Sequence, residues 1–414
     1  MTTTRPTASS PTADSVGRPA GPGRPTGTDQ TAGAGRWLAA GLAVCTVGWG
    51  ANQFAPLLLL YRPRLGLSAA IVEATFGMYA LGLMPGLLVA GRLSDRIGRR
   101  PVVVFAVALS MAGGAVLMLG SHGVGWLFAG RVIMGVASGC AFSAGSAWIK
   151  ELSEGAAAGA GARRASAAMT LGFGLGPLAA GMLAQWAPAP TVLPYLPQLG
   201  LAAAALPLAA RTPETVPPGT GPWTLRVHGL GAPWFLRVVL PVAPWVFGSA
   251  AIAMVYLPGL VTDRVPGIAV LFGALAALCT ALSGVLVQPL ARRLAHPDRP
   301  RLLLIGMSLV TAGLLLEALA AGVRQPALVL LTAPVLGAGY GFTLVFGLAE
   351  VQRRARPAEL AGLTAVFQAA TYLGFAAPFL LSVLHRYASA STLLLITAAL
   401  AAVTLAGANR QARR

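Results

Sequence analysis

Long apolar runs separated by short polar breaks are the feature that most constrains this fold. From Trp37 onward, runs of about twenty residues recur, and an α-helix of that length spans a bilayer core of roughly 30 Å. Lipid offers no water to the backbone, so such runs can cross it only as helices. The sequence predicts twelve of them. They cover about 37–60, 70–91, 101–120, 124–148, 166–187, 191–210, 234–260, 267–291, 302–322, 326–350, 360–384 and 389–408.

The composition favours the same environment. Of the 414 residues, 56% are apolar or aromatic and only 10% are charged. A soluble domain usually has about 25% charged residues. We therefore predict an all-α membrane protein with twelve transmembrane helices.

Arginine clusters follow every second run, and their placement predicts the orientation. Cytoplasmic loops carry an excess of Lys and Arg, so both termini and the central linker are expected in the cytoplasm, with the chain multi-pass in the plasma (inner) membrane. The clusters also account for the formal net charge of +18. On a soluble chain that charge would suggest nucleic-acid binding, but no nucleic-acid motif is present and no such partner is predicted.

Two polar segments divide the chain. Residues 1–35 are rich in Thr, Pro, Gly and Ser and have too few large apolar residues to fold, which predicts a disordered cytoplasmic tail. The Pro- and Gly-rich residues 211–233 have the composition of a linker. They separate a predicted N-terminal six-helix bundle (36–210) from a C-terminal one (234–409), which a basic tail (410–414) follows.

The loop after the second run carries the most specific motif. Residues 91–100 read GRLSDRIGRR. This resembles the signature loop between helices 2 and 3 of transporters of the major facilitator superfamily, and every fixed position matches. The resemblance implies twelve helices in two six-helix pseudo-repeats, which move against each other in alternating access.

The resemblance also implies that this loop is a gate. In the family, the aspartate found here as Asp95 latches the two halves in the outward-facing state, at the start of helix 11, here near 359–362. An acidic residue at the inner end of helix 4 is the usual partner of the basic residues. The alternative is that the arginines only set the topology. The predicted gating residues are Gly91, Asp95, Arg96, Gly98, Arg99, Arg100 and Glu151.

Two further motifs resemble those of proton-coupled drug and metabolite efflux antiporters. Arg131, in the fourth run, lies in a segment similar to the helix-4 arginine motif; the alternative is that its side chain snorkels to the interface. In the fifth run, Gly172, Gly176, Pro177 and Gly181 resemble the family's glycine-proline motif, although Ala180 replaces one glycine. The alternative there is ordinary close packing.

Proton coupling usually needs an acid inside the membrane. Glu73, near the outer end of the second run, is the predicted coupling acid, and its alternative is a surface carboxylate. Glu317 lies on the ninth run, which the resemblance places at the periphery. Substrate is expected near the midplane between the halves. The polar and aromatic candidates for that cavity are Asn52, Gln53, Tyr79, Trp148, Trp245, Tyr256, Gln368 and Tyr372.

The function predicted from the sequence is secondary active transport by alternating access, with proton-coupled export of a drug-like molecule or small organic metabolite. An importer or facilitator on the same fold is the alternative, and a non-transporting membrane scaffold a more distant one. The sequence holds no nucleotide loop, metal cluster or nucleophile constellation, so no enzymatic activity, cofactor or metal is predicted. The expected partners are the substrate, protons and the lipid bilayer, and the family resemblance implies a monomer.

Overall fold

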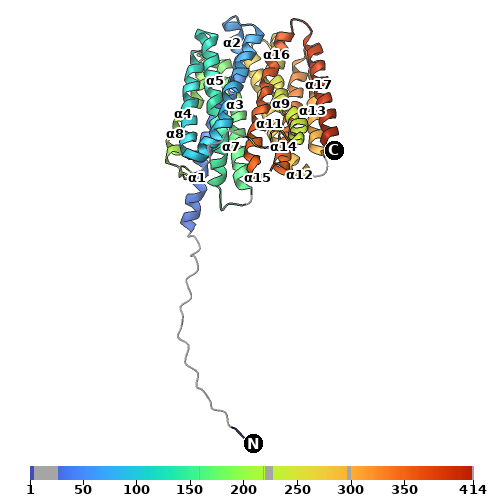
Figure 1. Cartoon of the computed structure of the whole chain (residues 1–414). Coiled ribbons are helices and arrows are strands. Elements are labelled where there is room, and N and C mark those ends of the chain that lie inside the picture. Colours follow the sequence, from blue (N-terminus) through green and yellow to red (C-terminus); the bar gives the residue numbers. More distant parts are fainter. Residues whose placement is uncertain (4–26, 158, 218, 220–226, 296–299, 413–414) are drawn as a thin grey trace.

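A computed structural model describes residues 1–3, 27–157, 159–217, 219, 227–295 and 300–412. Every regular element in this part of the chain is a helix. Twelve helical spans are long and apolar enough to cross a membrane, and they stand side by side as one bundle (Figure 1). The predicted all-α fold with twelve transmembrane helices is confirmed.

The first six spans contain both straight and interrupted helices. The first span breaks at Gln53, and the fourth contains a π-helical turn. The elements are α1 (Gly27–Asn52), α2 (Phe54–Arg64), α3 (Ala69–Ile97), α4 (Arg99–Met118), η1 (Leu119–His122), α5 (Val124–Cys140), η2 (Ala141–Gly145), α6 (Ser146–Glu151), α7 (Ala160–Trp186), η3 (Leu193–Tyr195) and α8 (Leu196–Arg211).

The last six spans begin with the most irregular one, in which two π-helical turns, η4 and η5, flank α9. Such turns occur often at functional sites. The elements are η4 (Phe235–Val239), α9 (Leu240–Ala251), η5 (Ile252–Tyr256), α10 (Leu257–Leu260), η6 (Thr262–Arg264), α11 (Ala269–Leu286), α12 (Gln288–Leu294), α13 (Arg301–Val323), α14 (Pro326–Arg354), α15 (Pro357–Thr371), η7 (Tyr372–Ala376), α16 (Ala377–Leu384) and α17 (Ala390–Ala412).

The helices extend beyond both predicted tail boundaries. Helix α1 begins at Gly27, inside the tail predicted to be disordered up to residue 35, and α17 continues to Ala412, inside the predicted basic tail. Adding a residue to an existing helix costs far less than starting one, so polar residues can continue an apolar span. The rest of these predictions, at residues 4–26 and 413–414, lies outside the described residues.

Successive spans run in opposite directions, so the chain enters and leaves the bundle at one end. We call this the terminal end, and the opposite end the distal end. The segment 212–234 joins α8 to η4 at the terminal end, and its residues 218 and 220–226 lie outside the described part.

Helices α3 and α5 pack with their backbones in contact. A Cβ atom at Gly135 would overlap the carbonyl oxygen of Tyr79, and one at Gly139 would overlap the backbone of Gly86. A Cβ atom at Gly82 would likewise overlap the backbone of Val132. Small residues allow this approach where lipid supplies no hydrophobic drive for association.

We predict that Gly135→Val destabilises the bundle, because the new side chain must push α3 away from α5. Overpacking of this kind costs about 1–3 kcal/mol, which thermal unfolding of the purified protein would report as a lower midpoint. Gly125→Val is the matched control on the same helix, because Gly125 is exposed and a Cβ atom there meets nothing within 4 Å. Equal midpoints for the two variants would refute the close packing.

Candidate functional site

A single glycine joins α3 to α4 at the terminal end. Gly98 has φ 102°, in the left-handed region that favours glycine, and its N–H donates to the Ser94 carbonyl at 3.1 Å. The chain therefore reverses direction in one residue. Arg99 is consequently placed at the first position of α4, close to the end of α3.

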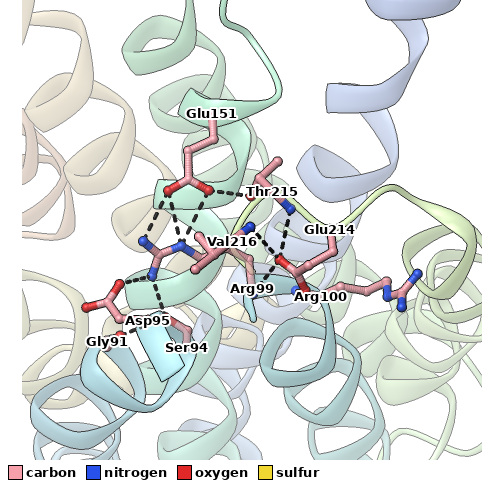
Figure 2. Close-up of polar contacts among 9 residues, drawn as sticks. All are labelled: Gly91, Ser94, Asp95, Arg99, Arg100, Glu151, Glu214, Thr215 and Val216. Carbon is pink, nitrogen blue, oxygen red and sulfur yellow. Dashed lines mark hydrogen bonds and ion pairs between the residues drawn. The ribbon is translucent and has the colours of Figure 1, made fainter. Parts of the chain in front are cut away.

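The Arg99 guanidinium joins three helices (Figure 2). Its Nη1 lies 2.5 Å from Oδ1 of Asp95 on α3, and its Nη2 lies 3.1 Å from Oε1 of Glu151 on α6. Nη1 also donates to the Ser94 hydroxyl at 2.6 Å. The Arg99 side chain is only 12% exposed, so these charge-assisted contacts are partly shielded from solvent.

The central linker supplies a residue that the sequence analysis missed. The Glu214 carboxylate accepts hydrogen bonds from the backbone N–H groups of Arg99 and Arg100, at 2.8 and 2.9 Å, at the start of α4 (Figure 2). A carboxylate at a helix N-terminus also complements the helix dipole. A Cβ atom at Gly98 would overlap this carboxylate, so the glycine admits both the turn and Glu214.

The environment of Glu214 favours its charged form. Partial burial raises the pKa of the carboxyl, but the hydrogen bonds from the backbone amides of Arg99, Val216, Arg100 and Thr215 outweigh this effect, and the pKa is lowered overall. The linker is therefore held to the start of α4 by an ionised group at neutral pH.

Three further contacts attach the linker to the first six spans. The Thr215 hydroxyl donates to Oε2 of Glu151 at 2.5 Å, and the Gly219 N–H donates to the Arg96 carbonyl at 2.7 Å. The Trp148 indole N–H donates to the Pro213 carbonyl at 3.1 Å. Trp148 was predicted to line the substrate cavity. In the described conformation its buried N–H finds its acceptor in the linker.

Asp95 makes its ion pair inside the loop rather than across the bundle. Its carboxylate, 51% exposed, pairs with Arg99. At the start of α15, where the latch was expected, a Cβ atom at Gly229 of the linker would meet the Glu359 carboxylate. One at Gly362 would meet Val227. In this conformation the linker therefore lies against both the gating loop and α15.

The other predicted gating residues lie around this network. Arg100 and Arg96 are at the loop, where their backbone groups bond Glu214 and Gly219, respectively. Gly91 lies where α3 passes the π-helical turn η2, since a Cβ atom there would lie 2.8 Å from the Ser143 hydroxyl. All seven predicted gating residues are thus at the terminal ends of α3, α4 and α6.

Arg131 is fully buried inside the first six spans. Its Nη1 donates to the Ala51 carbonyl at 2.9 Å and its Nη2 to the Phe76 carbonyl at 3.3 Å. The guanidinium lies 5.0 Å from the ring centre of Phe54 and 4.5 Å from that of Tyr79, both within cation–π range. These contacts rule out snorkelling, because the side chain points into the bundle.

Glu73 lies between the two halves of the chain at the distal end. It is 7% exposed, so it is not the surface carboxylate of the alternative interpretation. Ser382 of α16 hydrogen-bonds with its carboxyl, and Arg62 of α2 interacts with it electrostatically. A buried carboxyl thus faces both halves where they meet.

Aromatic side chains fill the neighbouring interface. The rings of Phe76 and Phe375 have centres 4.8 Å apart, and those of Tyr79 and Tyr372 are 6.5 Å apart. The ring centres of Phe247, on α9, and Tyr372 are 4.5 Å apart in a tilted arrangement. Tyr79 and Tyr372, two predicted cavity residues, are therefore brought together across the halves by this aromatic cluster.

The glycine-proline segment of α7 packs against both halves. Cβ atoms at Gly172 and Gly176 would overlap the backbone of α1 at Cys45 and Trp49, and one at Gly181 would overlap Ala274 of α11. Pro177 lies buried between them. Near the distal end, the Gln185 amide donates to the carbonyl of Gly267, just before α11, and accepts from the Leu271 N–H of α11 at 3.4 Å.

The remaining cavity candidates do not share one environment. Gln53 is fully buried at the break between α1 and α2, and neither atom of its amide has a hydrogen-bond partner among the described residues. Asn52 and Gln368 are half-buried. Trp245 donates to the Thr404 hydroxyl of α17 at 3.2 Å. This hydrogen bond directs the indole N–H toward α17 in the described conformation.

Comparisons with known proteins agree with this architecture. A family model described as Major Facilitator Superfamily matches residues 38–378. The chain is 32% identical over 89 residues to multidrug resistance protein MdtL of Shewanella oneidensis, covering 22% of either chain. It is 33% identical over 116 residues to myo-inositol transporter 1 of Cryptococcus neoformans, covering 28% of this chain and 20% of that one. The matched segments thus span only about a fifth of these curated relatives.

Two solved structures share the fold. The human organic anion transporter MFSD10 (TETRAN) aligns with a TM-score of 0.63 at 18% identity, over 90% of this chain and 98% of that one. A POT family transporter in complex with 5-aminolevulinic acid aligns with a TM-score of 0.72 at 14% identity, over 91% and 95%. At such identities the likeness shows the fold alone.

We predict that Glu214→Gln lowers stability at neutral pH by about 0.5–1 kcal/mol, near the lower end of helix-capping effects because solvent screens the half-buried carboxylate. Ionised Glu214 stabilises the folded chain, so its contribution is complete above the ordinary glutamate pKa of about 4.3 and is lost as the pH falls through the lowered folded-state pKa. Thermal unfolding at several pH values measures this.

At acid pH the wild type should therefore be no more stable to thermal unfolding than Glu214→Gln. Glu154→Gln, at an exposed position of the next terminal-end loop, is the control for changing one charge. A difference that stays constant from neutral to acid pH would show that the charge of Glu214 does not hold the linker.

Proposed function

The chain belongs to the major facilitator superfamily, and from this premise we propose that it is a proton-coupled exporter of an amphiphilic or lipophilic organic molecule in the plasma membrane. Membership makes it a membrane transporter. The similarity to a multidrug resistance protein supports export, and the glycine-proline segment of α7 supports antiport with protons. An importer or facilitator on the same fold is the second candidate, which the similarity to a myo-inositol transporter favours.

The proposal assigns the terminal end to the cytoplasm, because the arginine clusters lie there. The side chains that join the halves gather at the distal end, as in the pairs Phe76–Phe375 and Tyr79–Tyr372. The conformation described is then the inward-facing one. In the outward-facing state, Asp95 exchanges part of its contact with Arg99 for the start of α15.

The observation that carries proton coupling is the position of Glu73. A carboxyl that is 7% exposed and lies between the halves is costly to ionise in this setting. When the distal end opens, water reaches the carboxyl, which can then exchange a proton with the outer side. Its protonation is therefore linked to the conformational change that alternating access requires.

The inner surfaces favour an organic substrate with aromatic or apolar parts. The aromatic cluster and the unpartnered Gln53 amide offer ring faces and one hydrogen-bonding group. These suit a molecule that combines an apolar body with few polar groups. A phosphate or other strong anion would need accessible arginines, and Arg131 is enclosed by aromatic rings and backbone.

We expect Glu73→Gln to uncouple transport from protons. The amide occupies the same volume but carries no exchangeable acidic proton. In proteoliposomes holding an internal pH dye, addition of lipophilic cations, amphiphilic antibiotics and amphiphilic metabolites should move protons with the wild type. The signal of Glu73→Gln should fall to that of empty liposomes, and that of Glu154→Gln should equal the wild type.

Substrate flux without proton movement in the wild type would refute antiport and favour a facilitator. If no compound of the panel moves although the protein is folded, the proposed substrate class is wrong.

Asp95→Asn should slow transport without abolishing substrate binding. Removal of the charge leaves Arg99 paired only with Glu151 and weakens the latch of the outward-facing state. We expect a lower rate of substrate-driven proton movement, with binding of the same compound to the purified protein nearly unchanged. A variant as fast as the wild type would show that the loop only sets the topology.

A further inference from the structure

A polar side chain lies at the distal end of α7, where the two halves of the chain meet. Gln185 is in the last turn of this helix and is half-buried. Its amide donates to the Gly267 carbonyl and accepts from the Leu271 N–H. Gln185 belongs to the first six spans, whereas Gly267 and Leu271 belong to the segment that opens the eighth. Both hydrogen bonds therefore join one half of the chain to the other.

The start of α11 has no side-chain cap of its own. The first N–H groups of a helix have no partner within the helix, and a polar side chain at the N-cap position usually binds one of them. In α11 that position is occupied by Ile268, whose apolar side chain makes no capping hydrogen bond. Leu271 is the third residue of α11, so its N–H is one of these groups. Gln185 therefore supplies, from the other half, the cap that the sequence of α11 lacks.

The turn before α11 presents a carbonyl to the same amide. Gly267 has φ 76°, in the left-handed region that favours glycine. A primary amide carries a donor and an acceptor at one end, so Gln185 can bind this carbonyl and the Leu271 N–H at the same time. A lysine in its place could only donate, and an ionised glutamate could only accept. The two hydrogen bonds thus account for an amide at this position.

Close packing seats the start of α11 between two helices of the first half. On the side of α7, a Cβ atom at Gly181 would overlap the Cβ atom of Ala274. On the side of α2, a Cβ atom at Gly273 would lie 2.8 Å from the Leu59 side chain. These contacts are apolar and tolerate sliding, whereas the hydrogen bonds of Gln185 are directional and depend on one arrangement of the halves.

We propose that Gln185 is the latch of the distal end, where its amide holds the two halves together by capping α11 across their interface. The proposal rests on the alternating access of the proposed function and requires neither proton coupling nor export. When the distal end opens, the end of α7 leaves the start of α11 and both hydrogen bonds break. Water then binds the freed groups, so the latch shifts the balance between the two conformations without locking either one.

Pulsed electron paramagnetic resonance on the purified protein in lipid measures this balance without any substrate. Spin labels at Ser121 and His385, exposed distal positions in different halves, follow the opening once the three native cysteines are replaced by alanine. Gln185→Met keeps the length of the side chain and removes both hydrogen bonds. The ratio of distal-open to distal-closed molecules should rise roughly fivefold, the factor that corresponds to the loss of a typical helix cap.

Gln325→Met is the matched control, because Gln325 is exposed at the distal end and its side chain makes no capping hydrogen bond. This variant should keep the wild-type distribution of distances. The shorter Gln185→Asn retains an amide that cannot reach both backbone groups, so it should shift the distances in the same direction as Gln185→Met. This second variant keeps the test decisive if Gln185→Met does not fold.

Unchanged distances in the Gln185 variants would overturn the proposal, and so would an equal shift in Gln325→Met. Proton movement in proteoliposomes separates this result from the proposed function. If the distances shift but no compound moves protons, the latch stands and the exporter proposal fails. If compounds move protons but the distances stay the same, the exporter proposal stands and the latch fails.

Discussion

The cost of placing a charge away from water governs every ionisable group in this bundle. Two carboxylates stabilise the charge of Arg99 near the terminal end, whereas backbone carbonyls and ring faces stabilise that of Arg131. Among the described residues Glu317 has neither kind of partner, so the neutral form of its carboxyl is favoured. The same constraint therefore gives an ion-pair network at one end of the bundle and buried carboxyls without an ion pair toward the other.

The central linker is bound to the motif loop and to the start of α4, so it belongs to any gate that this loop forms. Glu214 and Thr215 bind the start of α4 and Glu151, whereas the far part of the linker lies against α15. A segment attached to both moving halves must change at least one set of these contacts when the halves rock. Breaking the contacts of the ionised Glu214 carboxylate costs more than breaking apolar contact with Val227, so we expect the contacts with α15 to change first.

The twelve spans and the turn at Gly98 were predictable from the sequence, each for a physical reason. The lengths of the apolar runs predict the twelve spans, because the thickness of a bilayer fixes the length of a helix that crosses it. The turn at Gly98 follows from a motif whose glycine the backbone requires. The partners of Trp148 and Trp245, and the role of Glu214, were not predictable, because each depends on a contact with a residue 65, 159 or 115 positions away. Local pattern carries no information about such distant partners.

Residue type alone does not tell whether an acid within an apolar run is exposed or buried, and the structure decides this for two of them. Glu73 and Glu317 look alike in sequence, each an isolated carboxyl within an apolar run, and the structure shows that both are buried. Proton coupling in such a fold needs no acid in the middle of a substrate cavity. It needs a carboxyl whose access to water changes when the halves separate, and an interface residue such as Glu73 satisfies that requirement.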